Sequence, residues 1–231
     1  MSFDTTRARA AILKRIRTNQ RRSGAPTDAE RAQAEDYLAQ HATGPRPVLT
    51  GDLTLHFRQM AERMSSTVDE VGSMAEAPGA VMRYLAAQGL PPRAVVWPLL
   101  AQLPWGEAGL AVEVRRPRRD ESQGADLVGV TGCLCALAET GTLVLASAGD
   151  APASTHLLPE THVAIVPASR IVATMEDAFA LMRAERGGVE SMMPRALNMV
   201  SGPSRTGDIE QTIVLGAHGP YRVHIVVVTG A

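Results

Sequence analysis

The chain has 231 residues, enough for one large domain or for a domain with an extension. Its 23 basic and 24 acidic side chains give a formal net charge of −1 at pH 7, so overall charge favours neither nucleic acid nor an anionic membrane as a partner. No apolar run reaches the roughly 18 residues of a membrane-spanning helix, and the N-terminus is too polar for a signal peptide. The sequence therefore predicts a soluble, cytoplasmic protein.

The only two cysteines, Cys133 and Cys135, are separated by one residue. They cannot form a disulfide framework, and structural zinc or an iron–sulfur cluster usually needs four protein ligands. We interpret both as buried free thiols and predict no metal site in this chain.

A first helix is predicted at residues 4–18, where apolar residues recur at helical spacing. These apolar residues are Ala8, Ile12, Leu13 and Ile16. They form a stripe that requires a partner surface. The basic residues between positions 15 and 22 fit either a docking patch for an acidic protein surface or a solvated helix face.

A second helix begins after Thr27, which forms a capping-box pattern with Glu30. The glycine and prolines of residues 44–47 cannot continue a helix and mark a linker. The sequence thus divides into a helical N-terminal extension, residues 1–45, and a larger domain, residues 46–231.

The larger domain opens with a helix capped by Asp52. A strand at residues 67–71, a helix at 80–88 and a strand at 94–97 then form a β-α-β unit, which implies parallel pairing. Further strands are predicted at residues 110–114, 127–131, 142–146, 163–166, 197–200 and 222–228, and a further helix begins at Thr174. The predicted fold class is α/β, with a mainly parallel sheet flanked by helices in three layers.

The most informative stretch is residues 198–220, NMVSGPSRTGDIEQTIVLGAHGP. A strand ends there in Ser-Gly-Pro-Ser, where Gly202 tolerates positive φ and Pro203 withholds a backbone donor. The turn leads to Arg205 and to a predicted helix start at Thr206 or Asp208. Free N–H groups, the Ser204 hydroxyl and a guanidinium suit a carboxylate or phosphate ligand.

Arg205 is the main candidate for binding a planar carboxylate such as that of a 2-hydroxy or 2-oxo acid. The alternative is an internal salt bridge with Asp208 or Glu210. His218 lies in a glycine-flanked turn, where its imidazole either transfers a proton or stabilises the turn. His224 alternates within the last strand and is predicted to be a core residue.

The segment Ala138–Thr142, AETGT, supplies a second candidate group. If Glu139 is buried, desolvation favours its neutral form and prepares it as a general acid or base. Its structural alternative is a carboxylate that holds the N–H groups of the following turn. Thr140 and Thr142 either orient a ligand oxygen or close that turn.

The common nucleotide and hydrolase signatures are absent from the sequence. It contains no GxGxxG after a strand, no Walker A pattern, no His-Glu-x-x-His and no GxSxG nucleophile elbow. Because hydride transfer needs a carrier for two electrons, this reaction by the chain alone has no sequence support.

AETGT, the Leu157–Pro159 segment, SGPSRTGDIE and Gly219-Pro220 together resemble the LUD-domain family, within it the lactate utilisation C group. The resemblance implies a fold like that of sugar-phosphate isomerases and coenzyme A transferases. It also implies a subunit of an iron–sulfur system that oxidises L-lactate to pyruvate. Such a subunit either binds the substrate or stabilises the complex, with clusters in the partner subunits and no cofactor in this chain. The sequence departs from the family pattern at Cys133, Cys135 and Gly207.

Two rival functions remain open. The first is a stand-alone enzyme acting on a phosphorylated or coenzyme A-linked small molecule, with Glu139 as base or nucleophile. The second is a purely structural assembly protein. Because open α/β sheets bind ligands beyond the carboxyl ends of their strands, we expect the candidate residues to converge there. The residues expected to converge are Glu139, Thr140, Ser204, Arg205 and Asp208.

Overall fold

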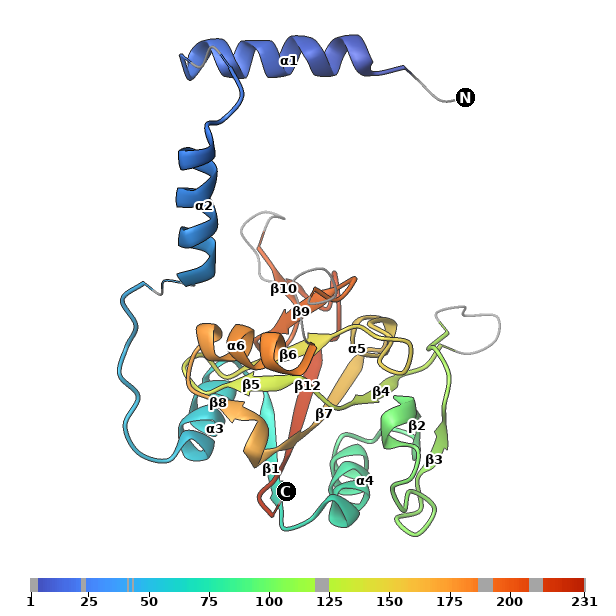
Figure 1. The fold of residues 1–231 in the computed structure, drawn as a ribbon. Helices are drawn as coiled ribbons and strands as arrows, with labels where there is room; N and C mark the ends of the chain where they lie inside the picture. Colours follow the sequence, from blue (N-terminus) through green and yellow to red (C-terminus); the bar gives the residue numbers. More distant parts are fainter. Residues whose placement is uncertain are drawn as a thin grey trace. The chain divides into compact units, whose positions relative to one another are not determined.

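The structure is a computed structural model that describes residues 4–21, 24–40, 42, 44–118, 125–186, 193–207 and 214–230 (Figure 1). The chain forms two compact units, Met1–Arg46 and Pro47–Ala231. No helix among the described residues has both the length and the apolar character needed to cross a bilayer.

The N-terminal unit contains helices α1 (Thr6–Asn19) and α2 (Asp28–Gln40). The capping box before α2 is confirmed: the Thr27 N–H donates to Glu30 Oε2 over 2.8 Å, and the Glu30 N–H donates to Thr27 Oγ1 over 3.2 Å. Neither helix contains a buried residue. Local capping therefore supports the start of α2, and neither helix contributes a described residue to a buried core.

The second unit is built on a six-stranded parallel sheet, as the β-α-β pattern predicted (Figure 1). Its order is β1-β12-β7-β4-β2-β3. The strands are β1 (Thr67–Val71), β2 (Arg93–Val96), β3 (Ala111–Glu113), β4 (Val128–Thr131), β7 (Thr161–Pro167) and β12 (Arg222–Val228). The central strands β4, β7 and β12 are almost wholly buried, which explains their continuous apolar runs.

Helices cover both faces of this sheet. Helix α4 (Ala77–Ala87) contacts β1 and β12, and the short helix α5 (Ser154–Leu157) contacts β4 and β7. Side chains alternate along a strand, so neighbouring residues of β7 belong to opposite faces. His162 is in register with Gly129 on the face beneath α5, and the adjacent Val163 is in register with His224 beneath α4. The three-layer α/β prediction is confirmed.

A second sheet of four strands was not anticipated from the sequence. Its order is β8-β5-β6-β9, and β6 pairs antiparallel with both β5 and β9. The strands are β5 (Cys135–Leu137), β6 (Thr142–Ala146), β8 (Ile171–Val172) and β9 (Leu197–Val200). The predicted strands at 142–146 and 197–200 therefore exist, but they lie outside the parallel sheet.

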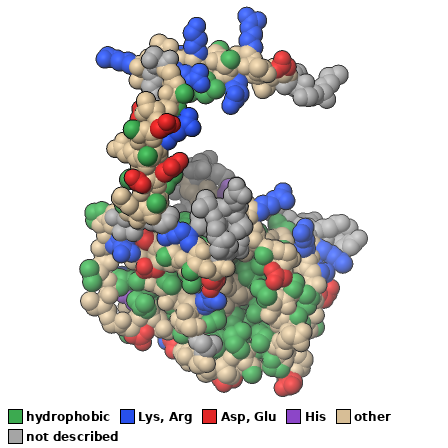
Figure 2. All heavy atoms as spheres, in the orientation of Figure 1, with side chains coloured by type: hydrophobic (Ala, Val, Ile, Leu, Met, Phe, Trp, Pro, Cys, Tyr) green, Lys and Arg blue, Asp and Glu red, His purple; other side chains and the backbone are tan. Residues whose placement is uncertain are grey.

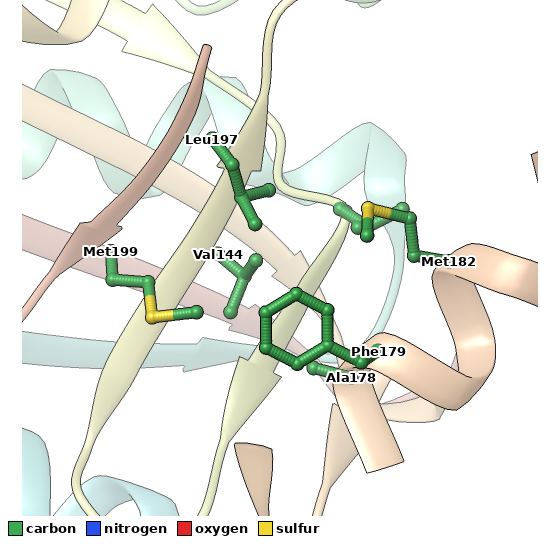
Figure 3. Close-up of a pocket in the computed structure, with 7 residues that line it drawn as sticks. Val144, Ala178, Phe179, Met182, Leu197 and Met199 are labelled. Carbon is green, nitrogen blue, oxygen red and sulfur yellow. The ribbon is translucent and has the colours of Figure 1, made fainter. Parts of the chain in front are cut away.

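The second sheet separates two apolar layers. Leu143 and Leu145 of β6 belong to the main core, whereas the intervening Val144 packs with Ala178 of α6 (Met175–Arg186). Figure 3 shows residues of α6 facing residues of β6 and β9 across a small apolar pocket. Its labelled lining residues are Val144, Ala178, Phe179, Met182, Leu197 and Met199. This lining offers no charged group to a polar substrate.

The remaining elements connect the sheets. They are α3 (Leu53–Arg63), the 3-10 turns Met74–Glu76, Pro98–Leu100 and Ala168–Arg170, and the hairpin strands β10 (Arg205–Thr206) and β11 (Val214–Leu215). The Asp52 cap of α3 is confirmed by a 2.8 Å bond from the Thr54 N–H. The helix start predicted at Thr206 is wrong, because antiparallel pairing with β11 holds that residue in a strand; Asp208 lies outside the described residues.

Candidate functional site

The two candidate motifs meet through their hydroxyl groups. Strands β6 and β9 place Leu143 opposite Val200, so Thr142 at the start of β6 lies beside Ser201 at the end of β9. The Thr142 and Ser201 hydroxyl oxygens are 2.6 Å apart, and Thr140 Oγ1 lies 2.7 Å from Thr142 Oγ1. Antiparallel pairing thus brings the AETGT and SGPSR motifs into one hydrogen-bonded chain of hydroxyls.

The end of helix α3 supports both motifs. A Cβ added at Gly141 would lie 2.2 Å from the Ala61 nitrogen, and one added at Gly202 would lie 2.0 Å from the Met64 carbonyl oxygen. Both glycines also have positive φ, of 65° and 77°. The two positions therefore require glycine for backbone conformation and for close approach to the same helix end.

Arg205 is held at this junction by a backbone contact. Its Nη2 donates to the Met64 carbonyl oxygen over 2.6 Å, and its side chain is exposed. Since a guanidinium has five N–H donors, this bond, the only one that the Arg205 guanidinium makes to the described residues, leaves donors for a carboxylate. The predicted alternative partners, Asp208 and Glu210, lie outside the described residues.

Glu139 precedes the hydroxyl chain and is partly exposed. Its N–H donates to the Ala173 carbonyl over 3.1 Å, and the Gly141 N–H donates to the Leu137 carbonyl over 2.9 Å. Backbone bonds therefore close this turn. Within the described ranges, no N–H of the turn donates to the Glu139 carboxylate, so its predicted structural role does not occur there.

Whereas Thr142 contacts Ser201, Ser204 is hydrogen-bonded to the segment before β12. Its N–H donates to the Pro220 carbonyl over 2.8 Å, and its carbonyl accepts the Gly216 N–H over 2.9 Å. Because β12 begins only at Arg222, these bonds place Ser204 at the amino end of the parallel sheet. The expected position beyond the carboxyl ends of the strands is therefore wrong for Ser204, since the hairpin folds back to the entry of β12.

His218 lines a hollow of about 550 Å³ at the amino ends of β4, β7 and β12. The polar side chains around it belong to Arg118, Asp126, Glu160 and Tyr221, and the apolar ones include Leu157 and Leu158. Neither Glu139 nor Arg205 lines this hollow. The two predicted catalytic residues thus face different surroundings, with Glu139 at the hydroxyl junction and His218 in the hollow.

A bidentate ion pair closes the rim of the hollow. Arg115 donates to both carboxylate oxygens of Asp126, over 2.6 and 2.9 Å, and the Arg118 N–H donates to the same carboxylate over 2.6 Å. Partial burial by itself would raise the pKa of Asp126, but these hydrogen bonds outweigh it and hold the pKa below its ordinary value. The Asp126 carboxylate therefore stays ionised and joins its own segment to the segment that contains Arg115 and Arg118.

Sequence reasoning missed two buried histidines. His162 Nε2 lies 2.8 Å from Thr131 Oγ1, and the His156 ring lies 5.7 Å from the His162 ring. Burial lowers the pKa of His156 to about 4 and that of His162 to about 3. Their strand and short-helix positions carry no motif, so the sequence offered no signal.

His224 is buried as predicted, and it stacks on Tyr84 with a 3.9 Å centroid separation.

Both cysteines are free thiols, as interpreted from the sequence, but only Cys135 is buried, whereas Cys133 is partly exposed. Burial raises the pKa of Cys133 to about 12 and that of Cys135 to about 11. No group of three or more His, Cys, Asp and Glu side chains suited to a metal ion occurs within the described ranges. The chain's two thiols are fewer than the four cysteine ligands that an iron–sulfur cluster usually takes.

Comparison with known proteins gives a consistent result. A family model described as the LUD domain matches residues 98–228. Lactate utilization protein C of Geobacillus kaustophilus is 36% identical over 171 residues, covering 67% of this chain and 70% of the relative. The protein of the same name from Geobacillus thermodenitrificans is 34% identical over 194 residues, covering 77% and 79%.

A solved structure is also similar. The crystal structure of a DUF162 family protein from Deinococcus radiodurans aligns with a TM-score of 0.56 and 25% sequence identity. The alignment covers 79% of this chain and all of that protein. The likeness supports the α/β fold independently of the short motifs.

Proposed function

Because the chain belongs to the LUD-domain family, we propose that it is the substrate-binding subunit of a cytoplasmic system that oxidises L-lactate to pyruvate. The names of its relatives support a role in lactate utilisation. The single observation that carries the binding role is the 2.6 Å contact between Thr142 and Ser201, which joins the hydroxyl-rich motif to the motif bearing Arg205.

The chemistry of the junction matches a small 2-hydroxy acid. In the proposed complex the lactate carboxylate accepts hydrogen bonds from the Arg205 guanidinium, whose geometry suits a planar anion. Thr140 and Ser201 have exposed positions at the same junction, and their hydroxyls are able to bond the substrate hydroxyl. Thr142 is 4% exposed and acts as the bridge between them.

The oxidation itself requires an electron acceptor. Conversion of lactate to pyruvate releases two electrons and two protons. In this proposal Glu139 would accept the hydroxyl proton, and the iron–sulfur oxidoreductase subunits would take up the hydride equivalent of the C2–H bond, that is, the two electrons and the second proton. The two free thiols of this chain support placing the clusters in those partners, because a cluster usually takes four cysteine ligands.

Two variants test the carboxylate role. Arg205→Ala removes the exposed guanidinium, and Arg83→Ala removes an exposed arginine from helix α4 as the matched control. Loss of a hydrogen bond to a charged group costs about 1.5–3 kcal/mol, which corresponds to roughly 10- to 150-fold weaker lactate binding. Calorimetric titration of lactate and turnover of the complete system measure the effect. Wild-type binding and turnover by Arg205→Ala would remove this residue from the site.

A second candidate function has one observation in its favour. The hollow beside His218 measures about 550 Å³ and combines leucines with charged side chains, so it offers more room than lactate needs. That size favours a larger phosphorylated or coenzyme A-linked substrate, with His218, which lines the hollow, as the candidate base in place of Glu139, which does not. Turnover of such a substrate by the isolated chain, without cluster-bearing partners, would distinguish this enzyme from the proposed subunit.

A further inference from the structure

Within the N-terminal unit, helix α1 has little tertiary packing. It has 14 residues, and no residue of α1 or α2 is buried. Helices shorter than about 12–15 residues are marginal in water unless packing supports them. Thr5, at the N-cap, also makes no side-chain capping bond. Within its unit the helix therefore has little tertiary support, although Asp4 Oδ1 accepts the Thr6 N–H over 3.0 Å at its start.

One face of α1 is suited to such a surface. Ile12 and Ile16 are one turn apart, and their side chains are 60% and 44% exposed. Ala8 lies one turn before Ile12 and continues the same stripe. Anchors at positions i and i+4 are the usual pattern of a helix that binds in a hydrophobic groove.

Charge determines which groove would fit. Five side chains of α1 are basic and none is acidic, and Figure 2 shows Lys and Arg along this helix. At about 100° per residue, Arg9 and Arg15 each lie roughly 60° from Ile12 and flank the apolar stripe. Arg7 and Lys14 lie on the opposite side. The stripe is therefore bordered by positive charge, which complements a groove with a carboxylate rim.

Helix α2 provides an internal comparison. It contains four acidic residues and one basic residue, and its apolar residues form no continuous stripe. The two helices thus differ in both charge and pattern, although neither contains a buried residue. The combination suited to docking, basic side chains beside an apolar stripe, occurs in α1 and not in α2.

Two other partner classes fit less well. A helix that lies in a membrane interface needs a broad apolar face with bulky residues such as Trp, Phe or Leu. The stripe of α1 has two isoleucines and no aromatic residue. Binding to nucleic acid relies on phosphate contacts, and the exposed isoleucines cannot make such contacts. An acidic protein groove uses both the stripe and its border.

We propose that α1 is a docking helix whose Ile12–Ile16 face enters an apolar groove rimmed by carboxylates on another protein. The inference is independent of the lactate role, because it depends only on the sequence and exposure of this helix. Arg9 and Arg15 provide the electrostatic complement, and the isoleucines provide the apolar anchors. Docking then orders a helix that is marginal by itself.

Site-specific photo-crosslinking in the native host tests the proposal. A photoreactive amino acid replaces Ala8, on the apolar stripe, or Ala10, on the opposite side of α1, in the full-length chain. We expect the Ala8 position to give one adduct with a different polypeptide, mapping to an apolar segment beside acidic residues. We expect the Ala10 position to give roughly tenfold less, because only one helix face enters a groove.

Matched charge reversals complete the test. Arg9→Glu/Arg15→Glu and Arg7→Glu/Lys14→Glu change the net charge equally and lie in the same helix. The first pair should reduce the Ala8 adduct roughly tenfold or more, whereas the second should retain it within about twofold. An adduct within the same chain, with a second copy, with lipid or with nucleic acid would overturn the proposal. Equal loss in both variants, equal labelling from both faces or the absence of any adduct would also overturn it.

Discussion

Thr142 and Ser201 are 59 positions apart in the sequence, yet their hydroxyl oxygens lie 2.6 Å from each other. The antiparallel pairing of β6 with β9 creates this contact, and the last turn of α3 packs beneath both turns. A site shared by the two motifs therefore depends on three segments, namely the α3 end and the two glycine turns. Each segment can be altered separately.

Gly202→Ala should destabilise the second unit. Its φ of 77° disfavours any side chain, and the added Cβ would lie 2.0 Å from the Met64 carbonyl oxygen. We expect a loss of about 2–4 kcal/mol in the free energy of unfolding, measured by urea denaturation. Gly149→Ala is the matched control, because a Cβ there meets no atom within 4 Å. Equal stability of the two variants would contradict the close contact.

A double-mutant cycle should detect the Thr142–Ser201 hydrogen bond. Thr142→Val and Ser201→Ala each remove one hydroxyl, and we expect a coupling energy of about 0.5–1.5 kcal/mol. Combining Thr142→Val with Ser169→Ala, an exposed serine in another segment, should instead be additive within about 0.5 kcal/mol. Additivity in both cycles would show that the hydroxyl pair contributes nothing to stability.

Stability should fall on mild acidification because of the buried histidines. Burial lowers the pKa of His156 and His224 to about 4 and that of His162 to about 3, below the ordinary 6.5. Between pH 6 and about 4.5 the unfolded chain binds protons that the folded chain does not, so each histidine contributes a slope of about 1.4 kcal/mol per pH unit.

His162→Gln removes one imidazole that takes up a proton on unfolding. The slope of the free energy of unfolding against pH should therefore fall by about 1.4 kcal/mol per pH unit. Trp97→Phe is the control, because Trp97 contacts the His156 ring edge-on but binds no proton. It should lower stability while leaving the slope unchanged. Urea unfolding at several pH values measures both quantities, and an unchanged slope in His162→Gln would refute a neutral buried imidazole at this position.

Asp126→Asn should weaken the rim of the hollow. We expect a loss of about 1–3 kcal/mol at pH 7, because Arg115 and the Arg118 N–H lose a charged acceptor. The pKa of Asp126 lies below its ordinary value, so this contribution is present above that value and disappears as the pH falls through the folded-state pKa. The difference between variant and wild type should therefore shrink in acid.

Glu113→Gln provides the comparison for that experiment. Glu113 also bonds Arg115, over 2.7 Å, but its side chain is 66% exposed. Solvent-screened pairs contribute little, so we expect a much smaller loss of stability than in Asp126→Asn. Equal effects of the two substitutions would contradict the special role of the bidentate pair.

The purified chain should contain no iron, flavin or nicotinamide and should not oxidise lactate with an artificial electron acceptor. Adding cluster-bearing partner subunits should restore oxidation, because those subunits accept the two electrons. Metal analysis, absorption spectra and the paired assays measure these outcomes. Robust lactate oxidation by the isolated chain would refute the division of labour.

The sequence by itself determined most of the parallel sheet. The apolar run at 222–228, rich in β-branched residues, matches β12 of that sheet in full, and the apolar run at 142–146 matches β6 of the second sheet, because buried strands need apolar side chains on both faces. Capping patterns likewise located α2, α3 and α6 from a few polar residues, since a cap is a local interaction. Periodicity also identified the exposed stripe of α1.

Only the tertiary structure decided how the motifs meet. The short strands β5, β8, β10 and β11 have two or three residues each, too few to show a period in the sequence. The pairing of β6 with β9 turns Thr142 toward Ser201, and the segment of β10 and β11 places Ser204 at the amino end of β12. Pairing between distant segments depends on the assembled core, so local sequence patterns predicted the site's members, whereas the long-range contacts set their arrangement.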